Sequence, residues 1–305
     1  MNGLTTTGLT KSYGTTQALD GIDLVVPAGS TYGLVGPNGS GKTTTLELLA
    51  GLRHPTSGTI RFDVSDGRVA YCPDAAEFEP WLTAVETLDV SARITGVTPT
   101  LPDLRALLDR VGLADAADRR VGGFSRGMTS RLNLAAGLVT DPTLLIADEP
   151  AAALDPAGRW EIIELLADLA GELTVIVSSH DLAEVERICD TIGVLTCGQL
   201  AYQGSLAELL DRAAPALRLV VRPPASTLLA ALSGASWVRA VSEGAPGDLR
   251  IDLADDAAAE IELPRLMADS GARLVALERA GVGLQDIFFE LTGTGPRRPE
   301  PHSVR

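Results

Sequence analysis

Short apolar runs alternate with helical patterns over the first two thirds of the chain. Residues 31–35, 144–147 and 173–177 are apolar runs with the length and composition of buried strands. Residues 44–50 and 161–169 have the spacing of apolar positions that is typical of helices. Because strands that alternate with helices build parallel sheets, this pattern predicts an α/β core with a mainly parallel sheet.

Two further regions surround this predicted core. Residues 4–10 and 21–26 are rich in β-forming residues and bounded by Gly and Pro, which predicts strands of an antiparallel edge sheet. Residues from about 75 to 140 have a mostly helical pattern with Pro and Gly breaks. We therefore expect a helical subdomain there.

The pattern changes near Ala213-Ala214-Pro215. Beyond it the order of predicted elements is βαββαβ, which suggests a small ferredoxin-like α+β unit. Its elements are strand 217–222, helix 225–233, strands 237–242 and 248–253, helix 257–270 and strand 273–278. An amphipathic segment at 284–291 follows. Since 305 residues are long for one domain, we predict two, at 1–213 and 214–293, and a disordered tail at 294–305.

Composition narrows the classes of partner. The formal net charge of −15 disfavours direct binding to nucleic acid or to anionic lipid, although it also fits a general solubility bias. We expect no nucleic-acid partner. If the chain works at a membrane, another protein must hold it there.

The sequence also predicts a cytoplasmic protein. No signal peptide is recognisable at the N-terminus, and no run of about 18 apolar residues could cross a bilayer. The three cysteines, Cys72, Cys189 and Cys197, are scattered and lack metal-site spacing. They are expected to be reduced thiols.

A glycine-rich loop joins the first predicted core strand to the helix after it. Its successive backbone N–H groups and the start of the helix form a concavity that suits phosphate groups. Lys42 is predicted to reach the β- and γ-phosphates, and the Thr43 hydroxyl to bind Mg²⁺. The loop and the first helical residue, all predicted to contact ATP, are Gly36, Pro37, Asn38, Gly39, Ser40, Gly41, Lys42, Thr43 and Thr44.

Two carboxylates end a second predicted core strand. Asp148 and Glu149 follow the run 144–147 directly. Asp148 is predicted to hold Mg²⁺ through water, and Glu149 to act as the general base that polarises the attacking water. Taken alone, the pair could be an ordinary turn after a strand, but the glycine-rich loop at 36–43, a P-loop by its sequence, favours the catalytic interpretation.

Further motifs follow in a recognisable order. They are Tyr13, Phe124-Ser125-Arg126-Gly127-Met128, Leu154-Asp155-Pro156 and Ser179-His180-Asp181. With the P-loop and the carboxylate pair, they resemble the adenine-stacking tyrosine, signature, D-loop and switch histidine of the ATP-binding cassette (ABC) ATPases. The resemblance covers roughly residues 4–210, and it implies a P-loop NTPase core of the ABC type.

The resemblance also implies a mechanism. Two cassettes pair head to tail around two ATP molecules, so we expect a homodimer with ATP at its interface. Ser125 and Gly127 of one copy then contact the γ-phosphate held by the P-loop of the other, with Asp155 in the neighbouring D-loop. Ser125 is also predicted to cap a helix from Met128 onward. His180 is expected to hydrogen-bond the γ-phosphate and to act in catalysis with Glu149 and Lys42.

Some positions depart from the family pattern. Asp74 stands where a glutamine is usual, and it is predicted to approach Mg²⁺ and the γ-phosphate while adding negative charge there. Arg126, Met128 and Ser130 alter the signature region, and Ala151-Ala152-Ala153 alters the D-loop. These changes leave the hydrolysis rate open.

The altered signature and the ending 284–293 resemble the drug-exporter (daunorubicin-resistance-like) branch of the family. That resemblance implies a separate integral membrane permease, ATP-driven export of a drug-like or lipophilic molecule, and a place at the inner face of the cell membrane. Two alternatives remain: a soluble ABC ATPase of DNA repair or translation, and a catalytically weak ATP-sensing regulator. Residues 78–82, which include Phe78 and Trp81, are a candidate docking segment, although aromatic residues also build cores.

Overall fold

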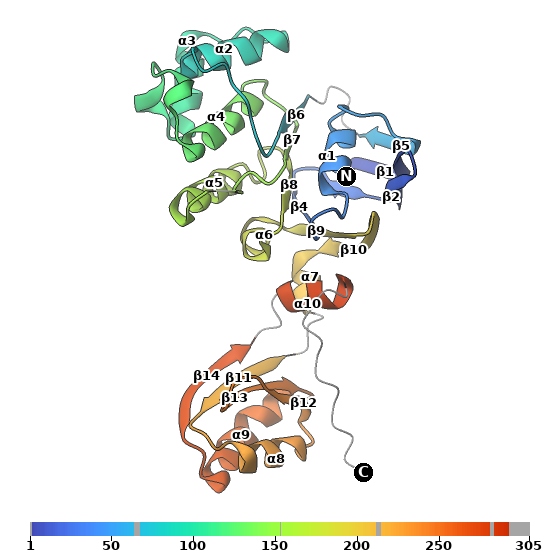
Figure 1. Cartoon of the computed structure of the whole chain (residues 1–305), viewed down its shortest axis with the longest axis vertical. Coiled ribbons are helices and arrows are strands. Elements are labelled where there is room, and N and C mark those ends of the chain that lie inside the picture. The colour runs from blue at the N-terminus through green and yellow to red at the C-terminus, as the bar shows by residue number, and fades with distance from the viewer. Residues whose placement is uncertain (1, 64–67, 153, 212–214, 281–283, 293–305) are drawn as a thin grey trace. The chain divides into compact units, whose positions relative to one another are not determined.

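The computed structural model describes residues 2–63, 68–152, 154–211, 215–280 and 284–292 (Figure 1). The chain divides into two compact units, Met1–Leu206 and Ala207–Arg305, and each is described by itself. The domain boundary expected from the sequence, 213/214, lies just after this division. Helix α7 (Leu206–Asp211) begins at the division. The tail expected at 294–305 lies outside the described residues.

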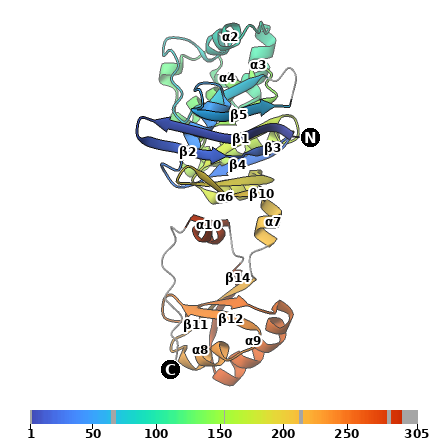
Figure 2. The same ribbon diagram turned by 90° about the vertical axis from the view of Figure 1, so that its right-hand side faces the viewer.

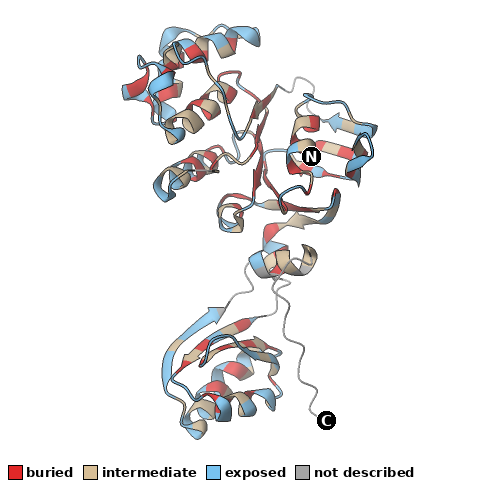
Figure 3. Cartoon of the chain, viewed as in Figure 1, coloured by how far each residue is buried: buried red, intermediate tan, exposed pale blue. Residues whose placement is uncertain are grey.

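The first unit is built on a six-stranded sheet in the order β10-β9-β4-β8-β7-β6. Strands β6, β7, β8, β4 and β9 are parallel, and β10 is antiparallel to β9. Every residue of β4, β7 and β8 is buried, as Figure 3 shows, which is expected for parallel strands covered on both faces. The strands are β4 (Thr31–Val35), β6 (Val69–Cys72), β7 (Leu144–Ala147), β8 (Thr174–Ser179), β9 (Thr191–Thr196) and β10 (Gln199–Ser205).

An antiparallel sheet flanks this core (Figure 2). Its long strand β1 (Asn2–Tyr13) pairs with β2 (Thr16–Ile22), β3 (Val25–Pro27) and β5 (Ser57–Phe62). The single strand predicted at 21–26 is wrong, because the chain is split there between β2 and β3. The Thr6 hydroxyl donates to the Ile22 carbonyl oxygen and accepts from the Leu24 N–H, both at 2.8 Å, and so replaces regular backbone pairing at the break.

Helices cover both faces of the parallel sheet (Figure 1). Helix α1 (Lys42–Leu49) and the antiparallel sheet share one apolar core with the central strands, in which Leu4, Leu46 and Ile176 are buried. Helices α5 (Pro156–Asp168) and α6 (Leu182–Ile188) lie on the other face. Helix α5 begins five residues before its predicted start, because the Asp155 side chain caps it and Pro156 occupies its first turn.

The predicted helical subdomain is confirmed. It contains α2 (Ala84–Ile94), α3 (Leu101–Arg110), α4 (Arg126–Leu138) and two 3₁₀ turns, Ala114–Ala116 and Val121–Gly123. Reciprocal capping boxes begin α2 at Thr83 and α3 at Thr100. These helices bury an apolar core of their own, which includes Leu88, Leu108 and Leu132.

The second unit has the element order that the sequence predicted. Its elements are β11 (Ala216–Val221), α8 (Ser226–Ser233), β12 (Val238–Glu243), β13 (Asp248–Leu253), α9 (Asp256–Ser270), β14 (Leu274–Ala280) and α10 (Leu284–Thr292). The sheet is antiparallel in the order β12-β13-β11-β14. Strand β13 therefore lies between β11 and β12, as in a split βαβ arrangement. Helices α8 and α9 pack on the sheet through an apolar core that includes Leu228, Trp237 and Leu263.

Candidate active site

Four parallel strands end at one edge of the central sheet, and each is followed by a predicted site residue. The P-loop follows β4, Asp74 follows β6, Asp148 and Glu149 follow β7, and His180 follows β8. Because the carboxyl ends of parallel strands meet at the same edge, residues far apart in sequence come together there.

The P-loop depends on its glycines for its path. Gly39 and Gly41 have φ of 80° and 108°, which favour glycine. A Cβ on Gly36 would lie 2.2 Å from the Leu195 carbonyl oxygen. Within the part of the chain that the structure describes, Ser40 Oγ is buried and has no hydrogen-bond partner. A buried, unpaired hydroxyl in a glycine-lined loop suits a polar ligand such as a phosphate.

Lys42 lies inside this loop with its side chain buried. Its Nζ donates to the Gly36 carbonyl oxygen at 2.8 Å and lies 3.6 Å from Glu149 Oε1. Thr43, the next residue, is exposed at the start of α1. The Lys42 ammonium thus connects the P-loop to the Glu149 carboxylate, which follows β7.

Glu149 connects the P-loop to the loop after β8. It has an unusual left-handed φ of 47°, and its backbone N–H donates to Ser178 Oγ at 2.8 Å. Its Oε2 lies 2.6 Å from His180 Nδ1. The structure therefore brings together Lys42, Glu149 and His180, the three predicted catalytic residues.

The Asp148 carboxylate is held by two hydroxyl groups that the sequence did not single out. Ser178 Oγ donates to Asp148 Oδ1 at 2.6 Å, and the Tyr71 hydroxyl donates to Oδ2 at 3.3 Å. Burial, together with the charge of Asp148, raises the pKa of Tyr71 above its ordinary value, so this hydroxyl remains a donor. The sequence offered one sign of Ser178, which is its position directly after the apolar residues 175–177. It offered no sign of Tyr71, because the contact of Tyr71 with Asp148 depends on the strand order.

Comparisons with known proteins agree with this geometry. The sequence pattern of the ABC transporter family matches residues 19–152. The bacitracin transport ATP-binding protein BcrA of Enterococcus faecalis is 32% identical over 301 residues, which are 95% of this chain and 96% of BcrA. This chain belongs to the ABC transporter ATP-binding proteins.

Two further likenesses extend the comparison. The daunorubicin/doxorubicin resistance ATP-binding protein DrrA of Streptomyces peucetius is 39% identical over 218 residues, which are 67% of this chain and 66% of DrrA. A dimeric ATP-binding cassette solved in a post-hydrolysis state with ADP and Pi is 25% identical, with a TM-score of 0.60 over 67% of this chain and 98% of that cassette. This ABC protein is therefore an ATP-binding ATPase, and the predicted fold is confirmed.

Asp74 of the cassette lies in the loop after β6. Partial burial raises the pKa of its carboxyl, the negative charges of Asp148 and Glu149 raise it further, and His180 opposes them. The Asn133 side chain on α4 donates to the Pro73 carbonyl oxygen at 2.9 Å. The loop that carries Asp74 is thereby joined to the helical subdomain.

The remaining predicted residues lie at the ends of elements in the single cassette. Ser125 caps α4 by accepting from the Met128 N–H at 3.3 Å, and Asp155 caps α5 by accepting from the Gly158 N–H at 3.1 Å. Helix α4 starts at Arg126, two residues before its predicted start. Among the described residues, no hydrogen bond joins Ser125, Gly127 or Asp155 to the P-loop, and Ala153 lies outside them.

Tyr13 ends β1 with a partly exposed ring. Two cations flank the ring: Lys11 Nζ lies 5.1 Å from its centroid, and Arg53 Cζ lies 5.6 Å from it. Such a cluster suits a flat aromatic ligand that carries phosphate charge.

Proposed function

We propose that this ATPase powers a separate membrane-embedded permease that exports a drug-like or lipophilic molecule. The observation that carries the proposal is the similarity to BcrA, a bacitracin transport ATP-binding protein, over nearly the whole of both chains. The similarity to DrrA, a daunorubicin/doxorubicin resistance protein, supports the same class of cargo. No described helix is both long and apolar enough to cross a membrane. The cargo path then belongs to the permease, and this chain acts at the inner face of the cell membrane.

The contacts of Glu149 support a division of labour in hydrolysis. Glu149 Oε2, beside His180 Nδ1, accepts a proton from the attacking water, and His180 keeps the carboxylate oriented. Lys42 places its ammonium against the β- and γ-phosphates, where the P-loop amides and Thr44 at the start of α1 also bind. Positioning and charge neutralisation of this kind dominate phosphoryl transfer.

The donor set also fits Mg²⁺. Thr43 offers a hydroxyl at the start of α1, and the buried Asp148 offers a carboxylate already oriented by two hydrogen bonds. Oxygen ligands of this kind, completed by phosphate and water, are those that Mg²⁺ prefers. When bound, Mg²⁺ supplies positive charge that neutralises the phosphate oxygens. Asp74, in the loop after β6, is a further carboxylate that could approach the ion.

We further propose that hydrolysis takes place between two copies of the chain. Ser125 and Gly127 lie at the N-terminus of α4, where free backbone N–H groups favour an anion. In a head-to-tail dimer they contact the γ-phosphate bound to the other copy, with Asp155 beside it. The dimeric relative that holds ADP and Pi supports this arrangement. Tyr13 then stacks on the adenine.

The two aromatic side chains of the candidate docking segment 78–82 differ in their exposure. Phe78 packs against the core of the helical subdomain, whereas Trp81 is 64% exposed. Trp81 is thus the better candidate for contact with the permease, since exposed aromatic side chains are frequent binding anchors.

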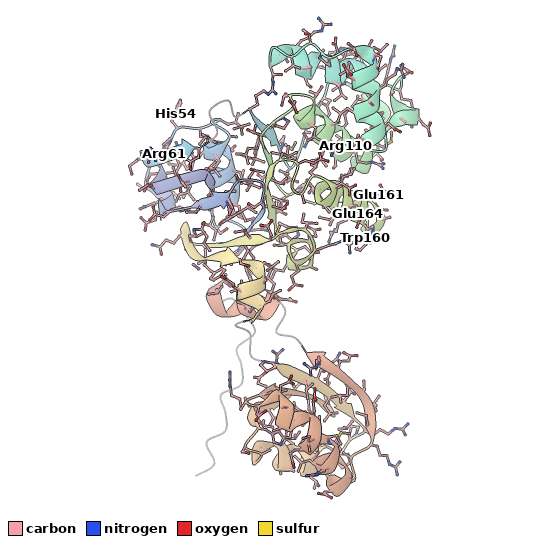
Figure 4. All side chains as sticks on the ribbon, turned by 180° about the vertical axis from the view of Figure 1, so that it is seen from behind. His54, Arg61, Arg110, Trp160, Glu161 and Glu164 are labelled. Atoms are coloured by element: carbon pink, nitrogen blue, oxygen red, sulfur yellow. The ribbon has the colours of Figure 1, made fainter. Side chains whose placement is uncertain are left out.

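The test is an affinity pull-down of the Glu149→Gln protein with ATP from detergent-solubilised native membranes. A multi-span membrane protein recovered in comparable amount supports the proposal. Recovery of this chain alone, or with soluble partners, contradicts it and favours a regulatory or non-transport ATPase. Trp81→Ala in the same background should reduce recovery of the permease. Trp160→Ala, which removes another exposed tryptophan on α5 (Figure 4), should not.

A further inference from the structure

The two edge strands of the second unit differ in what they expose. On β12, Val238 and Val241 pack against the core of the unit, and the exposed positions include Arg239 and Glu243. On β14, Leu274, Val275 and Leu277 are 53%, 60% and 47% exposed. Figure 3 shows β14 as a largely exposed strand. Edge strands are normally protected by charge, and each of these strands carries two charged residues. Strand β14 differs because it also exposes three large apolar side chains.

Helix α9 leaves part of β14 uncovered. A cavity of about 270 Å³ lies between them, lined by Leu217 and Leu277 from the sheet and by Leu263 and Pro264 from the helix. Strand β14 pairs with β11 on one side, and its other side is an open edge within the described sheet. An open edge with apolar side chains is suited to the addition of another strand.

We propose that β14 pairs antiparallel with β14 of a second copy of this chain, which joins two four-stranded sheets into one of eight. Such a contact is isologous, so each copy offers the same surface. Directly opposite residues of an antiparallel pair point to the same face of the sheet. A two-fold axis perpendicular to the sheet must therefore lie where one residue is opposite its own copy, and not between two successive residues.

The length and the charges of β14 together select the register of this pairing. An axis at Leu277, the middle residue of β14, pairs the whole strand and places Val275 opposite Arg279 and Ala276 opposite Glu278, without like charges in register. An axis one residue earlier would oppose Arg279 to Arg273, and one residue later would oppose Glu278 to itself, both of which are destabilising. The charges of the strand also have partners within their own unit: Arg279 pairs with Asp256 at 3.0 Å and with Glu260 at 2.9 Å, and Glu278 lies 3.8 Å from Arg218.

A disulfide test can detect this register in the full-length protein. In a Cys197→Ser background, which removes the exposed native thiol, Leu277→Cys places two thiols directly opposite each other. Opposite residues of an antiparallel pair have Cα atoms roughly 4.5–5.5 Å apart, within reach of a disulfide. We expect mild oxidation of nucleotide-free protein to convert most of it to a linked dimer.

Two variants serve as controls. Val275→Cys would lie about 14 Å from its symmetry mate, too far for a disulfide, and Ile261→Cys is an exposed position on α9. Both should remain monomeric in a denaturing gel. The proposal is overturned if Leu277→Cys does not link, if Ile261→Cys links equally well, or if Val275→Cys links faster. ATP binding by the same samples is measured separately, so a failure of the interface is distinct from a failure of the ATPase.

A second, independent observation concerns Ser178. Its hydroxyl donates to Asp148 Oδ1 at 2.6 Å and accepts from the Glu149 N–H at 2.8 Å, so one buried side chain holds both groups that follow β7. We infer that Ser178 is a positioning residue that orients Asp148 toward Mg²⁺, an inference that rests on the proposed roles of Asp148 and Glu149. Partners that orient metal-binding groups in this way typically contribute 10–100-fold to metal affinity.

The test measures binding rather than turnover. In Ser178→Ala, a fluorescent ATP analogue should bind as in wild type in EDTA, while the Mg²⁺ concentration that enhances binding half-maximally should rise about 10-fold. Ser178→Thr keeps the hydroxyl and should restore it. An unchanged Mg²⁺ midpoint in Ser178→Ala, or failure of threonine to rescue, overturns the role of Ser178. If wild type itself shows no Mg²⁺-dependent nucleotide binding, the proposed site fails instead.

Discussion

The two units of the chain bury different kinds of side chain. Among the described residues, every buried polar or charged side chain lies in the first unit, including Lys42, Asp148 and Ser178. The second unit buries apolar side chains, and several of its arginines form ion pairs at the surface, such as Arg218–Asp248. A buried charge costs free energy unless it is paired. Buried charged side chains therefore indicate where the chemistry takes place.

This difference follows from the two sheets. Parallel strands covered on both faces leave their carboxyl ends as the place where loops meet, and the buried charged side chains of the first unit, Lys42 and Asp148, lie there. The antiparallel sheet of the second unit has open edges, and its unusual feature is the apolar strand β14. We therefore assign chemistry, with its ATP-dependent contact between copies, to the first unit, and a second contact between copies to β14 of the second unit.

The largest expected effect is that of Lys42→Ala. Removing the buried ammonium leaves the β- and γ-phosphates without their cation, and the rate of ATP hydrolysis should fall by at least about 1,000-fold. Phosphate release measures it. Arg61→Ala, which removes a cation from β5 (Figure 4), should hydrolyse ATP at the wild-type rate. Wild-type turnover by Lys42→Ala would refute the P-loop assignment.

The next effect separates binding from hydrolysis. Glu149→Gln keeps the size of the side chain but cannot accept a proton, so hydrolysis should fall roughly 100- to 10,000-fold while ATP still binds. Gel filtration should then show an association that appears only with ATP and Mg²⁺, which distinguishes it from nucleotide-independent pairing through β14. Glu161→Gln, on the surface of α5 (Figure 4), is the matched control and should behave as wild type. An elution position that ATP does not change, although ATP is bound, would contradict the head-to-tail arrangement.

The residues predicted from the sequence share one property: their signal is local. Gly36, Lys42 and Asp148 each stand at a fixed place beside an apolar strand, and the structure brings these strand ends together. Most predicted elements lie within two residues of their observed bounds for the same reason. The exceptions are α5, extended by the Asp155 cap, the break between β2 and β3 at Thr6, and β1, which runs three residues past its predicted end to Tyr13.

The residues that the sequence did not reveal depend on contacts between strands. Tyr71 reaches Asp148 only because β6 lies beside β7, and Ser178 does so only because β8 lies on the other side. Periodicity reports which residues are apolar, not which strands are neighbours. The exposure of Leu277 was equally hidden, since an edge strand and a central strand can have similar sequences.

A core substitution should distinguish the two units thermally. Leu249 on β13 is fully buried in the core of the second unit, so Leu249→Ala should destabilise that unit by about 2–5 kcal/mol. Because each unit has its own apolar core, calorimetry should show a lowered transition for the second unit while the first keeps its nucleotide-dependent transition. Ile261→Ala, at an exposed position on α9, is the control with little expected effect on unfolding. A single transition that shifts as a whole would contradict the separation into two units.

The smallest expected effect concerns Asp74. Asp74→Gln removes a negative charge beside Asp148 and Glu149, so hydrolysis at neutral pH should be retained or raised, by no more than about two-fold because exposed charges are screened.

The same substitution should change how stability depends on pH. The sign of this dependence follows from burial and from the charges of Asp148 and Glu149, which together raise the pKa of Asp74 above its ordinary 3.8. The folded state favours protonated Asp74, and the resulting stability is complete below the ordinary pKa and lost as the pH rises through the raised one. Thermal midpoints in EDTA should therefore converge for wild type and variant in acid and diverge toward neutral pH, with the variant higher. A difference that grows on acidification would contradict the sign, and complete loss of hydrolysis would identify Asp74 as a required ligand.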